Sequence, residues 1–193
     1  MMKKDAQRTK ARKADITTAA LELFFEKGYE ETSIRMIQKK LGKEPGLFYY
    51  YFDSKEAVFE AAIEMFFASY VESMEAILEE GKLAPEDTLT RYLDYIQNAT
   101  ESFRGQYLQT LHWSVLGAIR EHTMRIMRKY ILEILHIYLE NNIIKQPKIG
   151  LDITANLLAY GIGGSILYQA NETYTSQKAD AYRLIPMLLD LTE

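Results

Sequence analysis

Apolar residues recur at helical spacing along almost the whole of this 193-residue chain. Near the N-terminus, Ile16, Ala19, Ala20, Leu23 and Phe24 would line one face of a helix. No stretch of useful length alternates apolar and polar residues with the period of two that a half-buried strand needs. Glycine and proline are sparse and lie at the joints between the periodic segments. The pattern predicts an all-α protein of about nine helices.

The joints divide the chain after about its first quarter. Ser54 is expected to cap a long helix that ends at Gly81, and Pro85 marks the start of the next helix. Later joints are expected at Gly105, in the region from Gly117 to His122, and at Gln146-Pro147-Lys148. They would leave helices near 106–119, 122–142, 150–171 and 176–191.

Composition excludes several classes of function. The chain has no cysteine, which excludes disulfides, thiolate nucleophiles and cysteine-ligated metals. Its first residues are charged rather than apolar, unlike a signal peptide. The longest nearly uncharged run, Ile153 to Ala170, falls short of a membrane span. We expect a cytoplasmic protein with no membrane partner.

Charge is divided unevenly along the chain, whose formal net charge is −4. Residues 1–55 contain twelve Lys and Arg against eight Asp and Glu, whereas residues 56–193 contain eleven against nineteen. Most of the positive excess lies in the first thirteen residues. A basic end on an acidic body is typical of a protein that holds nucleic acid at that end. A solvated charged tail would explain the first residues equally well.

The segment that begins at Ser33 has the pattern of a helix-turn-helix. Ser33 is placed to cap a short helix, Gly42 to form a tight turn, and Pro45 to occupy the first turn of a second short helix. Two short helices across such a turn place a helix end in the major groove of DNA. We therefore predict a DNA-binding domain at residues 1–53 and a helical ligand-binding and dimerisation domain at residues 54–193.

These motifs resemble the N-terminal pattern of the TetR family of bacterial transcriptional regulators. The family pattern is an Ile-x-x-Ala-Ala-x-x-Leu-Phe helix, Gly-Tyr, a Thr/Ser-capped helix, a Leu/Phe-Tyr-x-Tyr-Phe recognition helix and Ser-Lys-Glu. The chain matches it in order and without a gap at residues 16–24, 28–29, 32–33, 48–52 and 54–56. The resemblance implies a homodimer in which a ligand in the C-terminal body changes the spacing of two DNA-reading heads.

The resemblance also implies which residues contact DNA. Tyr49 and Lys55 match positions that contact phosphate, and Arg35 would reach a phosphate or a guanine edge from the second helix. Tyr50 would either reach DNA or pack. The predicted DNA-binding residues are Ser33, Arg35, Lys43, Glu44, Leu47, Tyr49, Tyr50 and Lys55.

Four positions depart from the family pattern. The family usually has Ala at Gln38, an apolar residue at Lys43, a Ser or Thr cap at Glu44, and often Thr at Leu47. A glutamate at the start of the recognition helix would repel phosphate, and leucine cannot donate to it, although leucine could pack on a thymine methyl group. The base preference of the head therefore stays open.

Aromatic residues with polar tips gather between residues 89 and 138, as a largely apolar ligand cavity needs. The alternative is an ordinary aromatic core. The predicted pocket residues are Tyr92, Tyr95, Tyr107, His112, Trp113, Met124 and His136.

Small residues recur at helical spacing in the run after Ile153, where they would let another helix approach closely. With a helix near 176–191, this run is expected to form a dimer interface, and close packing inside one chain is the alternative. The predicted interface residues are Ala155, Ala159, Ile162, Gly163 and Ile166.

The sequence therefore predicts a dimeric DNA-binding transcriptional regulator, a repressor that a small-molecule effector releases from double-stranded operator DNA. The three histidines are scattered without the spacing of a metal site, and no catalytic or cofactor motif is present. We expect no enzymatic activity, cofactor or metal. The alternatives are a constitutive DNA-binding module without an inducer, and an enzyme or small-molecule carrier with a vestigial head.

Overall fold

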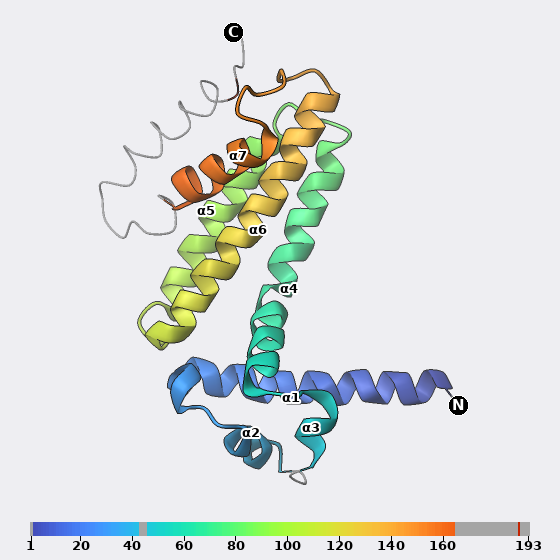
Figure 1. Cartoon of the computed structure of the whole chain (residues 1–193), viewed down its shortest axis with the longest axis vertical. Coiled ribbons are helices and arrows are strands. Elements are labelled where there is room, and N and C mark those ends of the chain that lie inside the picture. The colour runs from blue at the N-terminus through green and yellow to red at the C-terminus, as the bar shows by residue number, and fades with distance from the viewer. Residues whose placement is uncertain (1, 43–45, 165–188, 190–193) are drawn as a thin grey trace. The chain divides into compact units, whose positions relative to one another are not determined.

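The structure is a computed structural model that describes residues 2–42, 46–164 and 189. These residues contain seven α-helices and no β-strand, as the predicted all-α class requires (Figure 1). Seven is fewer than the nine or so expected for the whole chain, and the helix predicted near 176–191 lies outside the described residues except for Leu189. The helices are α1 (Met2–Glu31), α2 (Ile34–Leu41), α3 (Leu47–Tyr51), α4 (Lys55–Gly81), α5 (Thr88–Tyr107), α6 (Trp113–Glu140) and α7 (Leu151–Asn156), and a π-helix (Leu157–Gly163) continues α7.

Two predicted helix starts are confirmed by their capping hydrogen bonds. The Met36 N–H donates to Ser33 Oγ at 3.3 Å at the start of α2, and the Ala57 N–H donates to Ser54 Oγ at 3.1 Å at the start of α4. Each bond satisfies a backbone donor that has no partner inside the helix. The predicted end of the long helix at Gly81 is also confirmed.

Two predicted joints are wrong. α5 continues through Gly105 to Tyr107, and α6 is unbroken across the region from Gly117 to His122. A glycine inside a helix costs only about 1 kcal/mol relative to alanine, and at Gly117 the burial of Val115 and Ile119 outweighs this cost. The chain instead leaves the helix at residues 108–112, a stretch with neither glycine nor proline.

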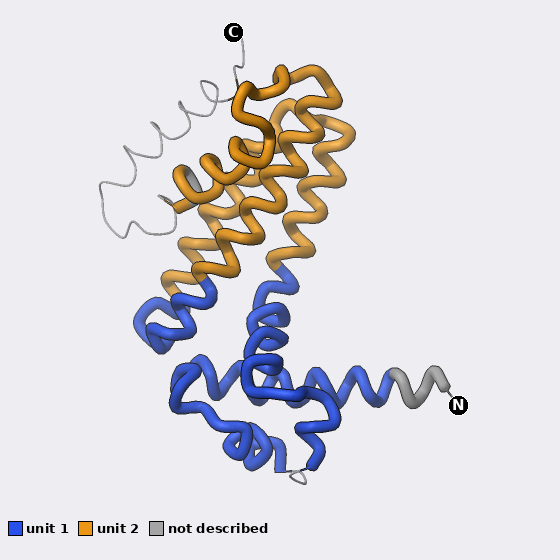
Figure 2. The backbone as a smooth tube through the Cα atoms, viewed as in Figure 1, with its two compact units in different colours: residues 1–69, 106–119 blue, residues 70–105, 120–193 orange. Residues whose placement is uncertain are grey.

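The chain forms two compact units, which Figure 2 distinguishes by colour. Unit 1 comprises residues 1–69 and 106–119, and unit 2 comprises residues 70–105 and 120–193. Each of α4, α5 and α6 begins in one unit and ends in the other. These units describe compactness, and the functional division after residue 53 stays a prediction.

The core of unit 1 is built on the predicted face of α1. All five residues of that face are buried, and Phe24 is fully enclosed. The Phe24 ring packs edge-on against Phe59 of α4, with centroids 4.8 Å apart, and the ring of Tyr29 lies 4.9 Å from the same Phe59. Burial of large aromatic rings supplies much of the stability of so small a core.

The core of unit 2 joins α5 to α6. The inner face of α5, which includes Leu89 and Tyr92, is buried against Ile131 and other apolar residues of α6. Tyr138 fixes the start of α5, because its hydroxyl accepts the Leu89 N–H at 3.1 Å and donates to the Glu86 carbonyl at 3.0 Å. Within the described part of the chain, no helix is long and apolar enough to cross a membrane.

Candidate nucleic-acid interface

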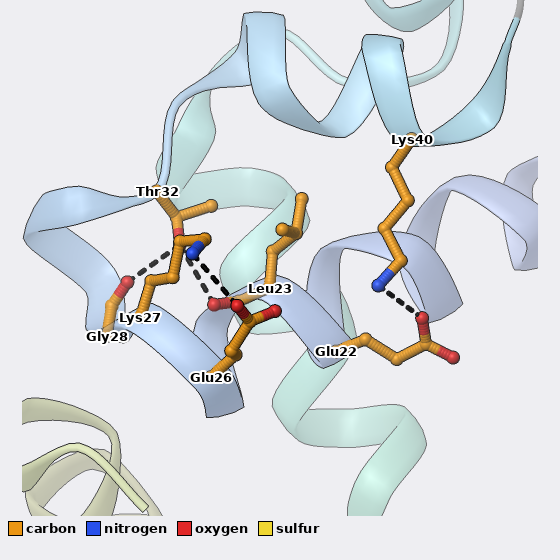
Figure 3. Close-up of polar contacts among 7 residues, drawn as sticks. All are labelled: Glu22, Leu23, Glu26, Lys27, Gly28, Thr32 and Lys40. Atoms are coloured by element: carbon orange, nitrogen blue, oxygen red, sulfur yellow. Dashed lines mark hydrogen bonds and ion pairs between the residues drawn. The ribbon is translucent and has the colours of Figure 1, made fainter.

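Polar contacts hold α2 against α1 (Figure 3). The buried Thr32 hydroxyl lies 2.8 Å from the Gly28 carbonyl and 3.1 Å from the Leu23 carbonyl, at the corner where the chain turns from α1 towards α2. At the far end of α2, Lys40 pairs with Glu22 of α1 at 2.7 Å. The buried hydrogen bond contributes more than the exposed ion pair. Together they set the direction in which α2 leaves α1.

The turn after α2 has the predicted form. Gly42 adopts a left-handed conformation with φ 60°, and its N–H donates to the Lys39 carbonyl at 3.1 Å. This conformation is favourable for glycine and ends the helix. The predicted contacts Lys43 and Glu44 lie outside the described residues, as does Pro45.

α3 separates core residues from exposed aromatic residues. Phe48 and Phe52 are buried, with ring centroids 5.8 Å apart. Tyr49 and Tyr50 are 61% and 75% exposed. The hydroxyls of both tyrosines can donate to phosphate or to base edges. Leu47 is half-buried beside them.

α2 contributes cations to the same unit. Arg35 and Lys39 are exposed, and Ser33 is exposed while its oxygen caps the helix. Because a hydroxyl that accepts a hydrogen bond still has a proton to donate, Ser33 is able to cap α2 and bind a phosphate at once.

Lys55 has a structural role that the sequence did not indicate. Its ammonium donates to the Tyr29 carbonyl at 2.9 Å and lies 4.1 Å from the centre of the Tyr29 ring. The Tyr29 hydroxyl in turn donates to Glu56 at 2.6 Å. Burial, followed by the Glu56 carboxylate, raises the pKa of Tyr29 to about 12. An ammonium has three donors, so the predicted phosphate contact of Lys55 stays a prediction beside this one.

The predicted pocket residues divide between the two units. Trp113 is 76% exposed, and Tyr107 packs edge-on against Phe25 with centroids 5.7 Å apart. The unit 1 members are Tyr107, His112 and Trp113, and the unit 2 members are Tyr92, Tyr95, Met124 and His136. Whether any of them contacts a ligand stays a prediction.

His112 forms the N-cap of α6 and packs against the end of α1. Its Nδ1 accepts the Ser114 N–H at 3.3 Å and lies 2.8 Å from Ser114 Oγ. Ser114 Oγ accepts the Tyr29 N–H at 3.2 Å. Ser114 therefore links the His112 ring to the backbone of Tyr29 at the end of α1. The imidazole occupies the space that a side chain at Gly28 would need.

Tyr92 is the most deeply buried of the unit 2 members. It is 0% exposed, and its ring stacks on Tyr130 with centroids 6.3 Å apart. Its hydroxyl is buried with no hydrogen-bond partner in the described part of the chain. Burial raises the pKa of Tyr92 well above 10, so the hydroxyl is a neutral donor. Met124 is also buried in this core, whereas His136 is exposed.

The predicted interface alanines pack inside unit 2. Ala155 and Ala159 are both 0% exposed in the core, which favours the alternative of close packing within one chain. Ile162 and Gly163 lie in the π-helix, but their side-chain surroundings are outside the described residues, as is Ile166 altogether.

An open depression of about 570 Å³ lies on the other face of α7, lined by Arg128, Ile153, Asn156, Leu157, Tyr160 and Gly161.

Residues 16–62 match the family model of the bacterial regulatory proteins of the tetR family. The uncharacterised HTH-type transcriptional regulator YvdT of Bacillus subtilis (strain 168) is 27% identical over 118 residues. That match covers 61% of this chain and spans 58% of the length of YvdT.

Solved structures share the fold over most of the chain. RolR in complex with resorcinol matches with a TM-score of 0.60 and 20% identity, covering 93% of this chain and 89% of RolR. Reduced NemR of E. coli matches with a TM-score of 0.57 and 17% identity, covering 94% and 100%. FadR from Bacillus subtilis in complex with stearoyl-CoA matches with a TM-score of 0.55 and 19% identity, covering 93% and 99%.

Proposed function

Because the chain belongs to the TetR family of bacterial transcriptional regulators, we propose that it is a homodimeric repressor which a small molecule releases from its operator. The observation that carries the DNA-binding part is the division of α3 into two faces. Phe48 and Phe52 anchor the helix in the core, while Tyr49 and Tyr50 are exposed. A short helix held in this way presents its outer face to the major groove.

The proposed interface has two kinds of contact, those with phosphates and those with bases. Arg35, Tyr49 and Lys55 bind phosphates and fix the position of the head on the duplex, without reading sequence. Leu47 and Tyr50, next to the groove floor, meet base edges and thymine methyl groups. The specificity of the head then depends on Tyr50 and on Leu47, one of the residues that depart from the family pattern.

The ligand part of the proposal concerns the predicted ligand-binding domain, residues 54–193. RolR and FadR share the fold and were solved with resorcinol and stearoyl-CoA, respectively. In this chain the unpartnered Tyr92 hydroxyl is the polar group that a ligand among Tyr92, Tyr95 and Met124 would meet. To move the protein from 1:99 to 99:1 between two states, the ligand must bind them with affinities that differ by about 10⁴-fold.

The dimer part of the proposal rests on exposed apolar side chains. Ile153 is 53% exposed, and Leu157 and Tyr160 are each 48% exposed, all around the depression on α7. A second copy covering them would remove apolar surface from water. Two heads joined in this way would read half-sites about one helical turn apart, or a multiple of it.

Fluorescence anisotropy against the DNA upstream of the protein's own gene tests this proposal. Random DNA serves as the competitor, and salt is varied. Saturable binding that survives the competitor, with two protomers per site, is the expected result. Equal, salt-sensitive binding to both DNAs would contradict an operator and favour an enzyme or carrier with a vestigial head. Specific binding that no small molecule weakens would favour the constitutive module.

Lys55→Ala is expected to weaken binding to operator and random DNA alike. Affinity falls as salt rises, and the loss of one phosphate contact makes the slope of log K against log salt less steep by about 0.9. The variant also loses the contacts of Lys55 with Tyr29, so its unfolding in urea is measured in parallel. Lys82→Ala, at an exposed lysine in unit 2, is the matched control. An unchanged slope in Lys55→Ala would remove Lys55 from the phosphate contacts.

A further inference from the structure

The first described turns of α1 form a basic arm, defined as residues 7–14, that lies outside the core of unit 1. Among residues 7–31 of α1, for which burial is described, the first buried side chain is that of Ile16. Every side chain of the arm is exposed except that of Arg12, which is half-buried. Figure 1 shows α1 continuing past α3 towards the N-terminus with no other element of the unit beside it. The arm therefore has a surface that no part of unit 1 covers.

The arm itself carries only positive charge, and it lies between Asp5 and Asp15 in the sequence. The arm contains Arg8, Lys10, Arg12 and Lys13 and no acidic residue. None of these four cations has an ion pair in the part of the chain that the structure describes. Arg8 and Arg12 are four residues apart, so they lie on one face of the helix and repel each other.

The arm gains little stability from packing, because its side chains are exposed or half-buried. The like charges of Arg8 and Arg12, four residues apart, weaken this part of α1. A row of anions would neutralise the repulsion between Arg8 and Arg12. The surface thus complements a regular, negatively charged partner.

The arm is continuous with the candidate DNA interface. Lys13 lies with its Nζ 5.1 Å from the centre of the Phe52 ring, and Phe52 directly follows α3. The cationic stretch therefore begins beside the end of the helix proposed to enter the major groove. DNA held by α3 would bring its own phosphate backbone to this part of unit 1.

We propose that the basic arm lies along the DNA phosphate backbone beside the groove that α3 enters, with Arg8 and Arg12 each neutralising a phosphate. The inference rests on the proposed DNA binding and extends the interface beyond the helix-turn-helix. An α-helix is about 10–12 Å wide and the minor groove about 6 Å, so the arm does not insert to read bases there. Its contribution is independent of sequence.

Salt dependence measures this contribution directly. Each phosphate neutralised contributes about 0.9 to the slope of log K against log salt. The double variant that combines Arg8→Gln and Arg12→Gln is expected to have a slope that is less steep by about 1.8. Between about 50 and 200 mM salt, the wild type should therefore lose roughly tenfold more affinity than the double variant.

The experiment uses the full chain and two labelled duplexes of about three helical turns. One has a random sequence and the other comes from upstream of the protein's own gene. Lys145→Gln with Lys148→Gln is the matched control, since it removes two exposed cations from the loop after α6. Arg8→Lys with Arg12→Lys keeps the charge and should keep the slope. Circular dichroism and urea unfolding verify that each variant is folded.

The expected result is a lower slope on both duplexes for Arg8→Gln with Arg12→Gln alone. An unchanged slope in this variant would overturn the inference, as would an equal decrease in the Lys145→Gln with Lys148→Gln control. If the wild type prefers its upstream DNA while the arm variant has the wild-type slope, the inference about the arm is wrong and the proposed function stands. If the wild type binds neither duplex, the inference and the proposed function are both wrong.

Discussion

Gly28→Ala is expected to destabilise unit 1 by about 3 kcal/mol or more and to abolish DNA binding at physiological temperature. Gly28 has φ 82° and ψ 173°, a backbone conformation that is essentially restricted to glycine. Any other residue there carries a backbone strain of about 1–3 kcal/mol. A second cost adds to this strain, because a Cβ at Gly28 would overlap the His112 ring.

The overlap matters because moving the His112 ring costs hydrogen bonds. Displacing the ring breaks its hydrogen bonds with Ser114, and Ser114 is also the acceptor of the Tyr29 N–H. Tyr29 carries the contacts of Lys55 and Glu56. The substitution therefore disturbs both the cap of α6 and the start of α4.

Equilibrium unfolding in urea and operator affinity measure the effect. Gly105→Ala and Gly117→Ala are the controls, because both positions are helical and an added Cβ would meet nothing within 4 Å. Each control should stabilise the protein by about 0.5–1 kcal/mol. A Gly28→Ala variant as stable as these controls would show that His112 does not pack against Gly28.

Tyr138→Phe is expected to destabilise unit 2 by about 1–3 kcal/mol. The Leu89 N–H lies in the first turn of α5, where it has no acceptor inside the helix. Without the Tyr138 hydroxyl, this buried donor is left unpaired, and the Glu86 carbonyl loses its donor. The lost hydrogen bonds cost more than the removal of one hydroxyl gains.

Tyr92→Phe in the same core is the matched control. The Tyr92 hydroxyl is buried without a partner in the described part of the chain, so its removal should leave stability unchanged or raise it. Thermal unfolding of the two variants side by side gives the comparison. Equal destabilisation by both substitutions would mean that the Tyr138 hydrogen bonds contribute nothing beyond the loss of a hydroxyl.

The features that were predictable from the sequence depend on neighbouring residues. The caps at Ser33 and Ser54, the turn at Gly42 and the inner face of α1 each arise from residues within a few positions of one another. Helical periodicity and capping chemistry act over that range. The helix-turn-helix was therefore recoverable before any coordinates.

The missed features depend on residues that are far apart in the sequence. The contact of Lys55 with Tyr29 joins residues 26 positions apart, and the Tyr29 N–H reaches Ser114 across 85 positions. No local pattern encodes either contact. Tertiary packing also explains the wrong joint at Gly117, where the burial of Val115 and Ile119 overrides the weak helix preference of glycine.

The continuity of three helices across both units means that no DNA-binding fragment can be cut free. The units divide after residues 69, 105 and 119, and all three points lie inside helices. Proteases cleave exposed loop tips far more readily than helices. A fragment ending at residue 53 would also lack Val58 and Ala62, which are both 0% exposed in the core of unit 1. Limited proteolysis should therefore degrade the chain without releasing a folded DNA-binding fragment.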